Sequence, residues 1–315
     1  MNRSMVIAQA PGSARERHYV AGPPRIGEAA IKVALVSCAG FVVATTIAML
    51  AFIAATGVRG ISDVGVRQLL TGTTWKPEAG SFGGLALITG TFSTAIGAVV
   101  LGAAPAVLAA VWLTEFAPDR VRRGYRRVME IASAVPSVVY GWLALVYLLP
   151  IMEDVGHAFY GADAPVTGEG IAASAVLLAI MIAPTVLLLS LDALSRVPRA
   201  LREASAALGA SPWQTAFNVS VPYGWRGVLV AVFFGFARAA GETMAVQMVI
   251  GGARKLPQNL FRPTTTISAQ IVMDMQNARP GTLENNVLFS MALVLLVFSV
   301  GVVLVTRALA KQKAR

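Results

Sequence analysis

The sequence predicts an all-α integral membrane protein with six membrane-spanning helices and both termini in the cytoplasm. Hydrophobic residues make up 56% of the 315-residue chain and charged residues only 13%, a composition far from that of an average soluble domain. The mean hydropathy is +0.67. Several uncharged runs are long enough to cross about 30 Å of hydrocarbon, which takes roughly 20 helical residues.

Six apolar runs are the predicted spans. The second run is longer than one crossing needs and contains Gly97, Gly102 and Pro105, so we expect a tilted, kinked or broken helix there, counted once. The predicted spans cover residues 33–55, 85–113, 128–150, 171–191, 228–250 and 287–306.

The positions of these spans divide the chain into four predicted parts. Residues 1–30 contain several prolines and glycines and are expected to be a disordered cytoplasmic tail. Residues 31–84 hold the first span and a periplasmic loop, and residues 85–308 form a core of five helices with a cytoplasmic loop at 198–222. Residues 309–315 are the cytoplasmic C-terminal tail. A cleaved signal peptide is disfavoured, because the first apolar run starts late and exceeds 20 residues.

The placement of Lys and Arg sets the orientation, since cytoplasmic loops retain positive charge. Both terminal tails and the second and fourth loops are rich in basic residues, whereas the third loop, residues 152–170, has four acidic residues and no Lys or Arg. The net charge of +10 therefore follows from topology and from contact with anionic headgroups of the bilayer. Nucleic-acid binding is not expected.

Few residues could hold a metal or a cofactor. Cys38 is the single cysteine and lies in the first predicted span, and His18 and His157 fall on opposite sides of the membrane. The phosphate-binding pattern G-x-x-x-x-G-K-S/T is absent. We therefore expect no cofactor in this chain, no enzymatic activity of its own, and ATP hydrolysis, if any, on a separate subunit.

The fourth loop has the signals of a helix-turn-helix. Pro198 suits the first turn of one helix and Gly209 its left-handed C-terminal cap. Ser211 can cap a second helix, which we expect to end before Pro222. Small side chains on the first helix could fit closely into a partner's groove, but packing on the membrane or on the chain's own bundle is equally compatible with the spacing.

The amino-acid sequence of this loop resembles the cytoplasmic EAA loop of ABC importer permeases. Glu203, Ala204, Gly209 and Pro222 match that pattern, while Ser205 replaces its second alanine. The resemblance implies the type I importer permease fold, also called MetI-like, over residues 85–306. It also implies that the loop docks into a cleft on the ATPase subunit, so that ATP-driven closure moves the membrane helices.

Two charged residues lie inside the fifth predicted span. Arg238 and Glu242 are four residues apart, which would place them on one helix face. Charges in a span are costly and usually face a bundle interior or a polar pathway. They form either a salt bridge that fixes packing or the lining of a route for a charged substrate. Arginine suits an oxyanion, whereas Glu242 could hold Arg238, accept a proton or weaken binding.

The string R-A-A-G-E-T-M-A-V around these residues resembles phosphate-specific ABC importer permeases. W-K-P from Trp75, G-T-F-S-T from Gly90 and T-E-F-A-P from Thr114 agree, and the run from Asn259 favours the PstC type. The resemblance implies import of inorganic phosphate with a PstA-type second permease, a PstB-type ATPase dimer and a PstS-type external binding protein. Permeases for other oxyanions or amino acids, an ion-driven transporter or channel, and an intramembrane enzyme are the alternatives.

Overall fold

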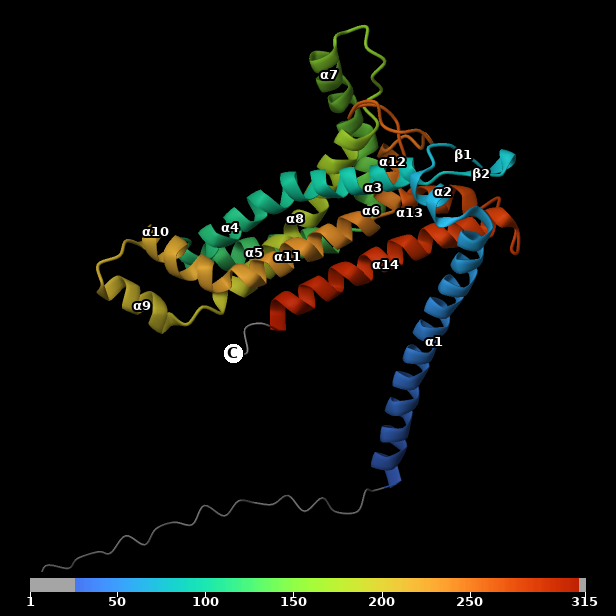
Figure 1. The fold of residues 1–315 in the computed structure, drawn as a ribbon. Helices are drawn as coiled ribbons and strands as arrows, with labels where there is room; N and C mark the ends of the chain where they lie inside the picture. The colour runs from blue at the N-terminus through green and yellow to red at the C-terminus, as the bar shows by residue number, and fades with distance from the viewer. Residues whose placement is uncertain (1–25, 312–315) are drawn as a thin grey trace, which may run out of the picture. The chain divides into compact units, whose positions relative to one another are not determined.

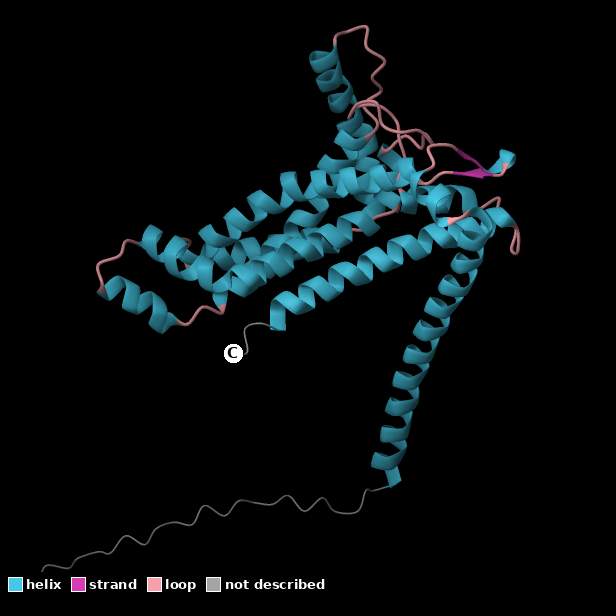
Figure 2. Cartoon of the chain, in the orientation of Figure 1, coloured by secondary structure: helices cyan, strands magenta, loops and turns pink. Residues whose placement is uncertain are grey.

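The computed structural model describes residues 26–311, which are almost entirely helical (Figure 2). Most of the predicted N-terminal tail and the last four residues of the C-terminal tail lie outside the described residues. Six helices within the described part are long and apolar enough to cross a membrane, as predicted. They are Ala30–Val64, Leu85–Glu115, Ser137–Tyr160, Ile171–Ser195, Pro212–Gly241 and Leu283–Ala308.

The chain divides into two compact units, Met1–Ala51 and Phe52–Arg315. In the first unit, the described residues belong to the N-terminal part of helix α1 (Ile26–Val64) and their side chains are exposed where described. Among the described residues, the second unit contains every other element and all of the buried core. The candidate sites therefore lie within one unit.

Helix α8 (Ile171–Ser195) is the centre of the bundle. It packs against α3 (Leu85–Ala98), α4 (Ala104–Glu115) and α11 (Val221–Gly241), which run alongside it in Figure 1. Helix α14 (Leu283–Lys311) packs against α11. Small residues allow these close crossings, as membrane helix interfaces require.

Three turns of π-helix interrupt the membrane helices, and each lies just before a proline. Proline lacks a backbone N–H and its ring clashes with the carbonyl four residues earlier, and that carbonyl belongs to the π-turn in each case. A wider turn relieves the clash and lets the helix continue. The π-turns η2 (Val99–Ala103), η3 (Ala144–Leu148) and η4 (Ala216–Ser220) precede Pro105, Pro150 and Pro222.

Of the tilt, kink or break expected in the second span, the structure excludes the break, since one helix runs from Leu85 to Glu115 through the π-turn η2. One expectation about a helix end was wrong for the same reason. The second helix of the cytoplasmic loop does not end before Pro222, since α10 (Pro212–Thr215), η4 and α11 form one continuous helix.

The third span begins later than predicted. The strongly amphipathic helix α5 (Asp119–Ala134) occupies the first part of that region and ends because Val135, which precedes Pro136, is extended with ψ 130°. The span itself then consists of α6 (Ser137–Leu143), η3 and α7 (Leu149–Tyr160). The basic residues of α5 therefore lie on a separate helix that packs against α8.

A short β-hairpin lies at the non-cytoplasmic end of the bundle. Strands β1 (Trp75–Lys76) and β2 (Ser81–Phe82) flank the turn η1 (Pro77–Ala79) and follow α2 (Val66–Thr71), as Figure 2 shows. Trp75 donates a hydrogen bond of 2.9 Å to the buried carboxylate of Asp274 on α13 (Ile267–Met275). Arg254 and Gln270 donate to the same carboxylate, so three segments of this end are joined at one residue.

Candidate functional site

The cytoplasmic loop forms a rigid two-helix turn, which confirms its predicted caps. Helix α9 (Arg199–Ala207) is followed by Gly209 with φ +81°, a left-handed conformation that favours glycine. Ser211 accepts a hydrogen bond from the backbone N–H of Gln214, and the Gln214 side chain accepts one from the N–H of Ser211 at 2.8 Å. This reciprocal capping box fixes the start of α10.

Residues 198–222 form a helical hairpin. Apolar side chains near the turn between its two helices are exposed. Leu208 is 90% exposed and Trp213 is 63% exposed, and Glu203 and Ala204 are exposed on α9 beside them. The Trp213 ring lies 4.4 Å from that of Phe217, centroid to centroid. Figure 1 shows α9 and α10 at one end of the bundle. Large apolar side chains gathered in this way are typical of a surface that a partner covers.

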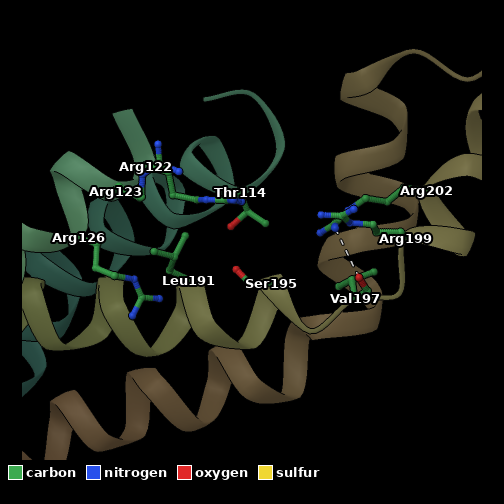
Figure 3. Close-up of a pocket in the computed structure, with 9 residues that line it drawn as sticks. All are labelled: Thr114, Arg122, Arg123, Arg126, Leu191, Ser195, Val197, Arg199 and Arg202. Carbon is green, nitrogen blue, oxygen red and sulfur yellow. Dashed lines mark hydrogen bonds between the residues drawn. The ribbon is translucent and has the colours of Figure 1, made fainter. Parts of the chain in front are cut away.

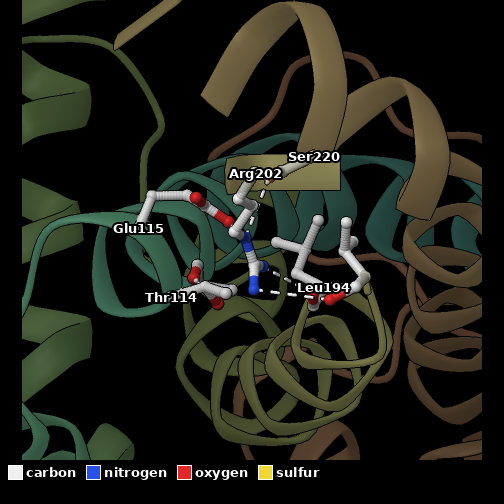
Figure 4. A network of polar contacts seen from close by, with 7 residues as sticks. Thr114, Glu115, Leu194, Arg202 and Ser220 are labelled. Atoms are coloured by element: carbon white, nitrogen blue, oxygen red, sulfur yellow. Dashed lines mark hydrogen bonds and ion pairs between the residues drawn. The ribbon is translucent and has the colours of Figure 1, made fainter. Parts of the chain in front are cut away.

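The partly buried side chain of Arg202 holds α9 to the membrane helices. Arg202 donates a hydrogen bond of 2.8 Å to the carboxylate of Glu115 at the end of α4, and the Glu115 side chain is only 7% exposed. The same guanidinium donates to the carbonyls of Leu194 and Val197 and, at 3.4 Å, to the hydroxyl of Ser220 (Figure 4). These contacts join α9 to the ends of α4 and α8 and to the π-turn η4, which continues into α11.

The spacing of residues along the sequence does not predict the contact between Glu115 and Arg202. Glu115 and Arg202 are 87 positions apart, so no helical spacing joins them. In the sequence, Glu115 belongs to the string T-E-F-A-P and Arg202 to the basic residues of the fourth loop. The available signal was the position of Arg202 directly before Glu203.

Arg238 lies at the inner face of the bundle, near the end of α11. Its side chain is partly buried, and its guanidinium donates a short hydrogen bond to the hydroxyl of Thr185 on α8. Thr185 follows Pro184, which lies inside α8. Within the described residues, no ion pair joins Arg238 to a carboxylate.

The prediction that Glu242 shares a helix face with Arg238 was wrong. Helix α11 ends at Gly241, and Glu242 is extended, with ψ 131°, before the short helix α12 (Met244–Val249) begins. Ser268 donates a hydrogen bond of 3.0 Å to the backbone carbonyl of Glu242 and so stabilises the break. The glycine next to Glu242 ends the α11 helix, and this removes the spacing of four on which the prediction depended.

A cavity of about 340 Å³ opens beside this break. Gly241, Thr243, Ser268 and Ser299 supply its backbone and hydroxyl groups among otherwise apolar side chains. The hydroxyls of Thr243, Ser268 and Ser299 each donate to a backbone carbonyl, so their oxygen atoms can only accept further hydrogen bonds in this mostly apolar cavity. In the described part of the chain, no group of three or more His, Cys, Asp or Glu residues could hold a metal ion.

Residues 106–315 match the family described as binding-protein-dependent transport system inner membrane component. The chain belongs to this family. It is thus a multi-pass inner-membrane permease of the ABC type, a class that works with a substrate-binding protein and an ATPase.

Individual relatives agree with this membership. The permease is 35% identical over 281 residues to a probable ABC transporter permease protein, YqgH, of Bacillus subtilis, covering 88% of this chain and 89% of the relative. It is 33% identical over 252 residues to the phosphate transport system permease protein PstC of Mesorhizobium japonicum, covering 76% and 77%. A similar PstC of Pasteurella multocida is 31% identical over 250 residues, covering 75% and 77%.

A solved structure has the same fold. The inward-facing MetNI methionine ABC transporter matches 72% of the permease and 94% of its own chain with a TM-score of 0.51 at 20% identity. This likeness supports the type I importer permease fold that the EAA-like residues predicted. At such low identity it carries no information on substrate.

Proposed function

We propose that this permease is one of two membrane subunits of an ATP-driven importer that carries inorganic phosphate across the cytoplasmic membrane. Several relatives that share about a third of its residues over three quarters of the chain are named phosphate permeases of the PstC type. The observation in the chain itself that best supports an anionic cargo is Arg238, a partly buried cation in the bundle without a carboxylate partner among the described residues.

Arg238 would bind the phosphate on its route. Its planar guanidinium can donate two parallel hydrogen bonds to an oxyanion while it remains protonated, and Thr185 holds it in position. Glu242 lies at the helix break next to the cavity and not beside Arg238 along one helix. We therefore assign Glu242 to the pathway near the break, where it favours release by keeping the binding of a dianion weak.

The hairpin would couple transport to ATP hydrolysis on a separate subunit. Glu203 and Ala204 present an exposed face, Gly209 fixes the turn, and Pro222 lies where the hairpin continues into α11. Because Arg202 ties α9 to three membrane helices, motion of the ATPase can move α11 and thus Arg238. A PstA-type permease, a PstB-type ATPase dimer and a PstS-type binding protein are the proposed partners, and ATP binds to the ATPase.

Uptake in cells tests the cargo. The permease is produced with its partner subunits in a strain that lacks its own phosphate uptake, and entry of radiolabelled phosphate is measured against sulfate, molybdate and amino-acid competitors. Arg238→Ala should abolish phosphate uptake while the complex still co-purifies. Arg226→Ala, a change of the same kind at the cytoplasmic part of α11, is the matched control. Unchanged uptake in Arg238→Ala would rule out the substrate-path role.

Coupling requires its own test. Glu203→Lys should uncouple ATP hydrolysis from uptake or prevent co-purification of the ATPase, because it reverses charge at the exposed face of α9. Uptake that persists with normal ATPase recovery would contradict the coupling role. Uptake without any ATPase would instead favour the channel or ion-driven transporter, and preferential uptake of sulfate, molybdate or an amino acid would favour another substrate class.

A further inference from the structure

A basic pocket of about 330 Å³ lies at the cytoplasmic end of the bundle, between α5 and α9 (Figure 3). The ends of α4 and α8 form its floor through Thr114, Leu191 and Ser195. In Figure 3 the hydroxyl groups of Thr114 and Ser195 lie between the arginines of α5 and those of α9. Five arginines line the pocket, namely Arg122, Arg123 and Arg126 from α5, and Arg199 and Arg202 from α9.

Two of these arginines carry charge that the described residues do not neutralise. The other three each contact a carboxylate. Arg122 pairs with Asp119 at 2.5 Å, Arg126 pairs with Asp192, and Arg202 pairs with Glu115 at 2.8 Å. Neither Arg123 nor Arg199 makes an ion pair or side-chain hydrogen bond within residues 26–311. Like charges on α5 and α9 therefore face one pocket.

We propose that this pocket binds one phosphate-type oxyanion, which bridges Arg123 on α5 and Arg199 on α9. A tetrahedral anion accepts several hydrogen bonds at once, and guanidinium groups match its geometry. Binding also removes the repulsion between the two unpaired arginines. Ser195 supplies a hydroxyl group of the kind that completes such a site, whereas the Thr114 hydroxyl already donates to the carbonyl of Ala110.

The anion acts on the hairpin because Arg199 is the first residue of α9. Bound anion fastens this end of α9 to α5, next to the Arg202 contact that fastens it to α4. On the basis of the proposed coupling function, occupancy then sets how freely the hairpin moves with the ATPase. Two sources supply this chemistry at the cytoplasmic surface, which are the headgroup of an acidic phospholipid and free inorganic phosphate.

The test uses the full chain purified in neutral detergent, in an Arg238→Ala background that removes phosphate binding in the transport path. One arm measures retention of phosphatidylglycerol against phosphatidylcholine by native mass spectrometry. The other measures binding of radiolabelled inorganic phosphate in phosphatidylcholine nanodiscs. The test variant is Arg123→Gln with Arg199→Gln. The matched control is Arg120→Gln with Arg127→Gln, which removes two exposed arginines of α5 that do not line the pocket.

Either phosphatidylglycerol or phosphate should bind the Arg238→Ala chain and its control equally and bind the test variant at least about tenfold more weakly. Binding in the first arm identifies a lipid headgroup, and binding in the second identifies free phosphate. Equal binding of both ligands by test variant and control would overturn the proposal. Loss of ATPase co-purification without any change in anion binding would also overturn it, since the pocket would then be a protein contact. Arg238 is absent throughout, so these outcomes are independent of the cargo.

Discussion

The contact between Arg202 and Glu115 leads to a quantitative prediction about how the hairpin is held to the membrane helices. Arg202→Met keeps an unbranched apolar stem but removes the guanidinium. The change deprives Glu115 of its cation and the carbonyls of Leu194 and Val197 of a donor. Because the Glu115 side chain is 7% exposed, water cannot readily replace the lost partner.

The expected magnitude follows from this burial. Removing one member of a buried ion pair costs about 3–5 kcal/mol, because the remaining charge is uncompensated. Glu115→Gln with Arg202→Met leaves no buried charge, so it should be less destabilising than the sum of the two single changes. The expected coupling between the two positions is about 1–3 kcal/mol, within the range for residues in direct contact.

Thermal unfolding of the full chain in detergent, followed by tryptophan fluorescence, measures this effect. Arg202→Met should lower Tm by at least about 5 °C, whereas Arg196→Met, an exposed arginine of the same loop, should leave Tm nearly unchanged. Equal Tm values for these two variants would refute the reasoning. So would a double variant whose loss of stability equals the sum of the single losses.

Three further changes test other parts of the structure. Gly209→Val should reduce ATPase recovery and uptake, because φ +81° costs a β-branched residue about 1–2 kcal/mol or more. Asp274→Ala should lower Tm markedly, since it leaves the buried donors of Trp75 and Gln270 without their acceptor, at a cost of about 1–3 kcal/mol each. Gly102→Val should destabilise the bundle by about 1–3 kcal/mol, because its Cβ would lie 2.5 Å from the backbone oxygen of Ala179.

Each of these changes has a control in the same chain. Gly124→Val is exposed on α5 and should not affect ATPase recovery, and Gly301→Val meets no atom within 4 Å and should preserve stability. Asp163→Ala removes an exposed carboxylate at the same end of the bundle as Asp274. If a test variant behaves like its control, the corresponding contact does not have the role described here.

Much of the membrane topology was predictable because it depends on local properties. Span number follows from hydropathy over about 20 residues, and sidedness follows from the placement of basic residues. The caps at Gly209 and Ser211 were predictable for the same reason, since a cap involves only a few neighbouring residues. Their geometry in the structure agrees with the prediction.

Errors arose where a local rule has more than one structural solution. A proline usually ends or kinks a helix, yet the helices continue through Pro105 and Pro222 by means of a π-turn. Spacing of four predicts a shared face only if the helix is unbroken, and α11 ends one residue before Glu242. A π-turn accommodates each proline, and α11 ends at Gly241 with Ser268 bonded to the carbonyl of Glu242.

The sequence alone determined that this chain is a six-span permease with a capped cytoplasmic hairpin and a charged residue, Arg238, in its fifth span. Tertiary structure decided which distant residues meet. It brought Glu115 to Arg202 and placed α5 opposite α9, so that Arg123 and Arg199 line one pocket. The physical reason is that hydropathy and capping act over one or two helical turns, whereas ion pairs and pockets depend on how separate helices pack.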